Sequence, residues 1–98
     1  MICVPNSFHL SGRTWTVEYH DLIDNDPDIY GDCDGAECVI RLRKGQKPET
    51  LQHTFYHELT HAFCYSLGWP KLNKDEGKID ALSNVLLQYL ASKRGHLK

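Results

Sequence analysis

The feature that most constrains this sequence is His-Glu-Leu-Thr-His at residues 57–61, inside a segment with the apolar periodicity of a helix. Positions i and i+4 of an α-helix lie one above the other on the same face. His57 and His61 can therefore direct two imidazole nitrogens at one metal ion, with Glu58 beside them. Two neutral nitrogens, a carboxylate and an open coordination position are the core of a zinc hydrolase site.

The helix that carries this motif is predicted to run from Pro48 to Leu67. Proline suits the first turn of a helix, where its missing N–H leaves no hydrogen bond unmade. Gly68 followed by Pro70 is a typical stop signal. The apolar residues predicted to form its buried arc are Leu51, Phe55, Leu59, Ala62 and Phe63. The histidine motif flanks this arc, as expected of a site at the edge of a core.

A third ligand is expected because catalytic zinc usually takes three protein ligands and one water molecule. A second amphipathic helix is predicted over residues 73–94, and Glu76 lies near its start, at the margin of the apolar face. Its carboxylate can reach the first helix from there. The alternative is a capping box in which Glu76 pairs with Asn73. The residues predicted to face inward on this helix are Ile79, Leu82, Val85, Leu86, Tyr89 and Leu90.

Asp80 lies one turn after Glu76, on the same side of the second helix. A metal-bound imidazole almost always donates its other N–H to a carboxylate or carbonyl. Asp80 is therefore a candidate for holding one histidine in its ligating tautomer, and the alternative is a solvated surface aspartate. Tyr65, one turn after His61, is a candidate donor to a developing oxyanion, and the alternative is a tyrosine packed at the rim.

HELTHAF, followed by Glu76-x-x-x-Asp80, resembles the gluzincin branch of the zincin metallopeptidases. The overall plan is similar to minimal gluzincins, small phage-encoded metallopeptidase-like proteins and ImmA/IrrE-type proteins. The resemblance implies one zinc ion per chain bound by His57, His61 and Glu76, with Glu58 as general base. It implies a peptide or protein substrate and endopeptidase activity. The separation of His61 from Glu76 is shorter than in the large thermolysin-like enzymes, whose specificity lobe this chain lacks.

The expected fold class is α+β, a minimal zincin-like fold in one domain over residues 1–98. A β-scaffold of two hairpins (1–47) is followed by the active-site helix (48–67) and the third-ligand helix (73–94). The hairpin turns are predicted at Ser11-Gly12 and at Asp34-Gly35. By the resemblance, the strand at 37–42 is the sheet edge that pairs with an extended substrate.

Composition excludes several classes of protein. The net charge is −2, without a basic face, so no nucleic-acid partner is expected. No apolar run reaches membrane-spanning length and no signal peptide is recognisable, so a cytoplasmic location is expected. Cys33 and Cys38 can pair across the second hairpin, although free thiols are the expected state. The aspartates at 24–34 lack the spacing of a calcium-binding EF-hand loop.

Two alternatives to a zinc peptidase remain open at this stage. One is a non-catalytic, zinc-stabilised protein-interaction module that acts by strand pairing with a partner, and the other is a helix pair that binds no metal. His96, near the C-terminus, is a further candidate, as an inhibitory ligand to the metal. The substrate and the oligomeric state have no signal in the sequence.

Overall fold

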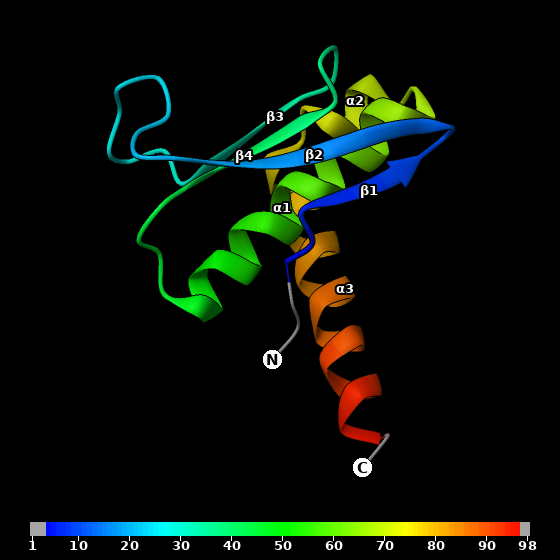
Figure 1. The fold of residues 1–98 in the computed structure, drawn as a ribbon. Coiled ribbons are helices and arrows are strands. Elements are labelled where there is room, and N and C mark those ends of the chain that lie inside the picture. Colours follow the sequence, from blue (N-terminus) through cyan, green and yellow to red (C-terminus); the bar gives the residue numbers. More distant parts are fainter. Residues whose placement is uncertain (1–3, 97–98) are drawn as a thin grey trace.

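The computed structural model describes residues 4–96, with side chains described as far as Lys93. A small sheet lies across helix α1, and α3 runs away from the sheet on the other side of α1 (Figure 1). The elements are β1 (Ser7–Leu10), β2 (Arg13–His20), β3 (Gly31–Asp34), β4 (Val39–Arg43), α1 (Pro48–Leu67), α2 (Pro70–Asn73) and α3 (Glu76–His96). The fold class is therefore α+β, as predicted.

The sheet has the strand order β1-β2-β4-β3. Both predicted hairpins form, because β1 pairs antiparallel with β2 and β3 pairs antiparallel with β4. A parallel pairing of β2 with β4 joins them into one mixed sheet. Ser11 and Gly12 have φ values of 50° and 78°, the left-handed pair that matches the twist of a tight hairpin.

The prediction that residues 37–42 form the edge strand is wrong. β4 covers most of that segment and lies between β2 and β3, so both of its sides are paired. Its Ile40 and Leu42 are completely buried, which favours the interior of the sheet. The short, polar strand β3 takes the edge instead, as is common for exposed edges.

Helix α1 packs its apolar arc against one face of the sheet. Trp15 of β2 and Phe55 of α1 are each 1% exposed, and the Phe8 ring lies between them in contact with both. The buried side chains of this core include Trp15, Cys38, Ile40, Leu42, Phe55, Tyr56, Ala62 and Leu87. This packing holds α1 in a fixed position beneath β3 and β4.

Two glycines allow β3 to approach α1 closely. A Cβ atom at Gly31 would lie 2.6 Å from Thr54 Cγ2, and a Cβ atom at Gly35 would lie 2.3 Å from the Tyr65 ring. Contacts this short do not occur, so any larger residue would push the strand and the helix apart. Gly31 and Cys33 alternate along β3 and Gly35 directly follows the strand, and all three residues face α1.

Helix α1 has the predicted bounds. Gly68 ends it in the left-handed conformation, with φ 71°, and its N–H donates to the Tyr65 carbonyl. The prediction of one continuous helix over residues 73–94 is wrong at its start, because the turn α2 ends at Asn73 and α3 begins at Glu76. The Asp75 carboxylate accepts the Lys78 N–H at 3.1 Å and caps α3, so Asn73 is not the capping residue.

The inward face predicted for α3 is only partly correct. Ile79 is buried and Leu86 and Leu90 pack against the core, but Leu82, Val85 and Tyr89 are 48%, 65% and 60% exposed. Ser83 and Leu87 are buried in their place. The reason is that α3 packs against α1 along one side only, so a narrow stripe of its surface is covered.

The cysteines and the termini complete the description of the fold. Cys33, Cys38 and Cys64 are free thiols, so the second hairpin carries no disulfide between its cysteines. Cys3 and the side chain of His96 lie outside the described part of the molecule. Between residues 4 and 96, none of the helices combines the length and the apolar character needed to span a lipid bilayer.

Candidate metal centre

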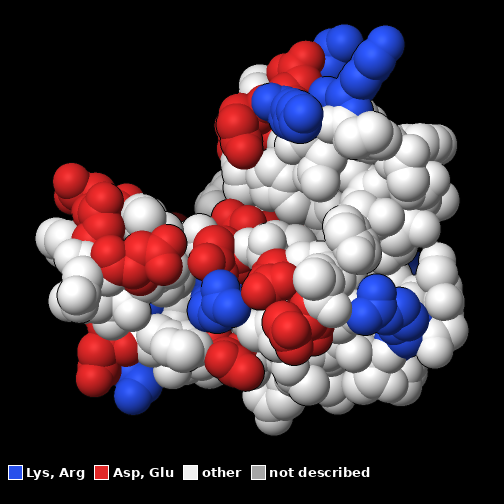
Figure 2. All heavy atoms as spheres, turned by 90° about the horizontal axis from the view of Figure 1, so that it is seen from above, with Lys and Arg blue, Asp and Glu red and all other residues white. Residues whose placement is uncertain are grey.

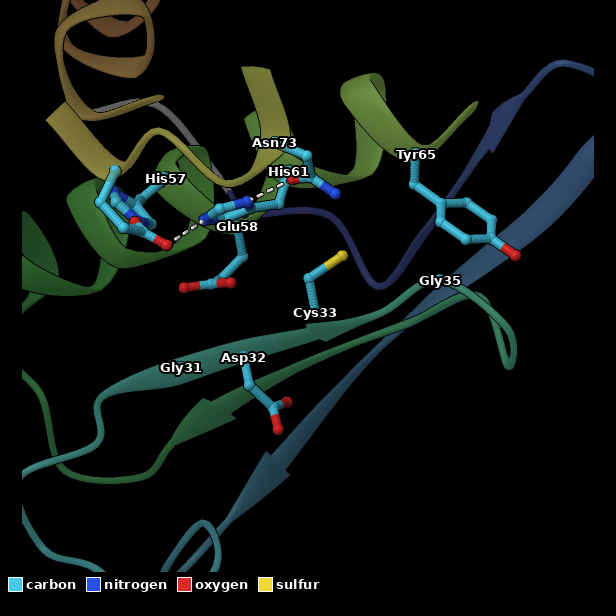
Figure 3. Close-up of a pocket in the computed structure, with 10 residues that line it drawn as sticks. Gly31, Asp32, Cys33, Gly35, His57, Glu58, His61, Tyr65 and Asn73 are labelled. Carbon is cyan, nitrogen blue, oxygen red and sulfur yellow. Dashed lines mark hydrogen bonds and ion pairs between the residues drawn. The ribbon is translucent and has the colours of Figure 1, made fainter. Parts of the chain in front are cut away.

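Helix α1 and the first residue of α3 bring three potential metal ligands together. His57 and His61 each offer a ring nitrogen and Glu76 offers a carboxylate oxygen, and these atoms lie within 4.8 Å of one another. His57 Nε2 lies 3.0 Å from Glu76 Oε2, and His61 Nε2 lies 3.1 Å from Glu76 Oε1. Figure 3 shows the histidines side by side on α1. The spacing of four residues and the reach of Glu76 are as predicted.

The other ring nitrogen of each histidine has its own acceptor. His57 Nδ1 lies 3.4 Å from Asp80 Oδ1, and His61 Nδ1 lies 2.5 Å from Asn73 Oδ1. Oxygens of this kind accept hydrogen bonds, so a neutral ring with its proton on Nδ1 satisfies this contact in both histidines. Each Nε2 is then left with its lone pair directed toward Glu76.

A proton or a cation between the histidines and Glu76 completes this arrangement. Carboxylate oxygens and the lone pairs of Nε2 repel each other at about 3 Å unless a proton or a metal ion lies between them. One divalent ion shared by the three residues meets this requirement without protonating both rings. Two imidazoles and a carboxylate are a donor set suited to zinc, so the residues present fit that metal.

Glu58 lies next to the ligands but is not one of the three. Its side chain is 9% exposed and accepts no hydrogen bond from any described residue. Burial raises the pKa of its carboxyl; the nearby His57 and His61 oppose the rise, while Asp32 and Glu76 add to it. A buried carboxylate without a hydrogen-bond donor is poised to accept a proton.

A groove between β3 and α1 gives access to these residues. It consists of two adjoining cavities of about 510 and 430 Å³, which share Gly31, His57 and Glu58 in their walls. The unpaired edge of β3 faces α1 across the groove (Figure 3). The groove can therefore take an extended chain along β3, with its middle over Glu58.

Tyr65 lies at the far end of the larger cavity. Its ring packs over Gly35 and makes an edge contact with Trp15, at 6.3 Å between ring centroids. In Figure 3 its hydroxyl is directed away from the histidines. The side chain would have to turn to meet an oxyanion near Glu58, so its role as a donor stays a prediction, and the structure shows a tyrosine packed at the rim.

The sequence analysis missed two residues of the site. The first is Asn73, which the sequence analysis considers only as the capping partner of Glu76. The residue that caps α3 is Asp75, immediately before Glu76. The second is Cys33, whose thiol points into the groove (Figure 3). Burial, and then the charges of Glu58 and neighbouring aspartates, raises the pKa of this thiol to about 12, so it is un-ionised at neutral pH.

The structure thus brings His57, Glu58, His61, Glu76 and Asp80 into one place and leaves the hydroxyl of Tyr65 apart from them. Comparison of the chain with protein-family models, with curated proteins and with solved structures gives no match.

Proposed function

We propose that this protein is a zinc-dependent peptidase of the gluzincin type, hydrolysing peptide bonds within an extended chain. The observation that carries the proposal is the meeting of His57, His61 and Glu76, from two separate helices, with ligand atoms within 4.8 Å of one another. Glu58 lies beside them, buried and without a hydrogen-bond donor, in the wall of an open groove.

In this proposal the Nε2 atoms of His57 and His61 and one oxygen of Glu76 hold the zinc ion. Asp80 and Asn73 keep the two rings in the tautomer that leaves Nε2 free. Zinc supplies a polarised water and a Lewis acid for the scissile carbonyl. Ligand rings that are already oriented bind the metal with little loss of side-chain freedom.

Glu58 acts as the general base. Its carboxylate takes a proton from a water molecule in the groove and passes that proton to the nitrogen of the leaving amine. A pKa raised by burial suits both transfers, since a group with a pKa closer to neutrality gives up a proton as readily as it takes one. The backbone of the substrate lies along the free edge of β3, where main-chain hydrogen bonds hold it without demanding particular side chains.

A second candidate function is a zinc-stabilised interaction module without catalysis. The free edge of β3 favours it, because strand pairing with a partner needs only that edge. This candidate predicts one zinc per chain and no turnover. It also predicts no effect of Glu58 on partner binding beyond small changes in stability.

The decisive experiment combines metal quantification with peptide digestion. Wild type, Glu58→Gln and His61→Ala are purified without a metal-affinity tag, analysed for zinc and incubated with a peptide library. We expect one zinc per chain in wild type and Glu58→Gln, and little in His61→Ala. Cleavage should fall by about 10²–10⁴-fold in Glu58→Gln, the usual range for loss of a general base.

Each other outcome removes one interpretation. If Glu58→Gln cleaves as fast as wild type, Glu58 is not the base. If wild type holds zinc stoichiometrically but cleaves nothing, the interaction module is the better description. If wild type holds no zinc, the histidine pair is a structural feature only.

A further inference from the structure

We infer that the His57 end of the groove binds a lysine or arginine side chain of the substrate, so that the protein selects cationic peptides. The inference rests on the proposed peptidase function, because it specifies which peptides the same groove takes. Three features carry it: the cavity at that end, the carboxylates in its wall with no lysine or arginine among them, and the different character of the opposite end.

The cavity at the His57 end has a volume of about 430 Å³, within the usual range of ligand pockets. It begins at the metal centre, with His57 and Glu58 in its wall, and extends to Asp28 and Tyr30 in the loop before β3. Asp80 of α3 also lines it. A side chain that enters from a peptide on the edge of β3 therefore passes between carboxylates.

No lysine or arginine among the described residues lines this cavity or its neighbour. Figure 2 shows acidic side chains gathered over one part of the surface, with few cations among them. Arg43 is the cation that contacts this wall, 4.5 Å above the Tyr30 ring, but it donates to the Pro27 carbonyl. The Asp28 carboxylate makes no ion pair within the described chain, so its charge stays available to a ligand.

Glu58 gives a second sign that a polar ligand belongs here. The residue is 9% exposed and lies in the walls of both cavities, and no hydrogen bond to its carboxylate is found within residues 4–93. Because the carboxylate lines the groove, a water molecule or a substrate group that enters can donate a hydrogen bond to it. Asp28 and Asp80 are exposed, so they add a negative potential at the mouth of the cavity that salt can screen.

The opposite end of the groove lacks this character. Its wall contains Cys33, Tyr65 and Asn73, none of them charged at neutral pH. Asp32 is at this end as well, but Arg41 binds it through two contacts of 2.9 and 3.1 Å. Its carboxylate is also directed away from the ligands in Figure 3. The preference for a cation should therefore apply to one side of the scissile bond only.

The test uses the zinc-loaded 98-residue chain and matched fluorogenic peptides that carry lysine or glutamine at successive positions around the cleaved bond. We expect kcat/KM to be about fivefold higher for lysine on one side, the effect of a partly exposed ion pair. The preference should shrink between about 50 and about 500 mM NaCl, as screening increases.

Two variants assign the preference to the cavity. Asp28→Asn should lower the lysine-to-glutamine ratio by about threefold, because it removes one unpaired carboxylate. Asp24→Asn is the matched control, since it makes the same change in the same loop outside the cavity wall. Asp24 has φ 52°, a conformation that asparagine accepts.

The failure of this inference differs from the failure of the proposed function. Equal cleavage of lysine and glutamine peptides at every position overturns the inference and leaves the peptidase intact. Cleavage of no peptide overturns the peptidase. In that case, fluorescence anisotropy measures the binding of the lysine and glutamine peptides to the zinc-loaded Glu58→Gln variant. Tighter binding of the lysine peptide supports the inference, and equal binding of the two peptides overturns it.

Discussion

The two faces of helix α1 differ in what surrounds them. On the face toward the sheet, Phe55 and Ala62 are 1% and 0% exposed, among apolar side chains. On the other face, His57 and His61 contact oxygens of α2 and α3, and Glu58 contacts no donor. The first face is complete in the protein alone, whereas the second leaves a place where a proton or a cation fits between the histidines and Glu76.

This difference separates stability from chemistry within one helix. Apolar burial on the core face stabilises the fold with or without metal. The site face collects the carboxylates of Glu58, Glu76 and Asp80 within a short distance, and like charges gathered in this way destabilise a metal-free protein. We therefore expect core substitutions to lower stability regardless of zinc, and site substitutions to act mainly through zinc.

The largest expected effect is that of Phe55→Ala. Removing a fully buried phenylalanine costs about 3–5 kcal/mol, a large part of the stability of a small domain. Urea unfolding followed by circular dichroism, with and without a chelator, should give the same loss in both conditions. Val85→Ala is the control: Val85 is 65% exposed, so its truncation should cost less than about 0.5 kcal/mol. A loss for Phe55→Ala confined to the zinc-loaded protein would contradict the separation of the faces.

A smaller effect is expected from Asn73→Ala on the site face. His61 Nδ1 donates to Asn73 Oδ1, and loss of such a support typically weakens metal binding by about 10–100-fold. Competition with a chromophoric chelator measures this change in zinc affinity, and Asn73→Asp should restore most of it by keeping the acceptor oxygen. Asn84→Ala, which removes an amide that contacts Asp80 but no ligand, should change the affinity far less. Equal losses in both variants would show that general loosening of α2 and α3 is responsible.

The parts of the fold that sequence predicts well depend on local signals. The bounds of α1 follow from Pro48 and Gly68, and the first hairpin follows from the turn at Ser11-Gly12. The pairing of His57 with His61 follows from helix geometry alone. Each of these needs only a few neighbouring residues, so the prediction does not depend on where other elements lie.

The errors concern relations between distant segments. The strand order depends on how the loop before β3 carries that strand past β4, which no pattern within either strand reveals. Which stripe of α3 is buried depends on the side of α3 that packs against α1. Helix α3 carries more apolar residues than this contact can cover. Asn73 joins the site because α2 is a separate turn, and the break before Glu76 was not recognised.

The smallest expected effect concerns the stability of the metal-free protein, and here Glu58→Gln should be a gain. The folded pKa of Glu58 lies above its ordinary value of 4.5 because the carboxyl is buried. The contribution of this group to stability is therefore fully present below about pH 4.5 and is lost as pH rises through the folded pKa. At pH 7 the ionised carboxylate destabilises the fold, while glutamine has nearly the same shape and no charge. With chelator present, urea unfolding should show Glu58→Gln more stable than wild type by about 0.5–2 kcal/mol at pH 7, and the difference should shrink toward pH 4.5. A variant that is less stable at pH 7 would mean that the metal-free site face is already satisfied, and the proposal of a cation at this face would lose its main physical support.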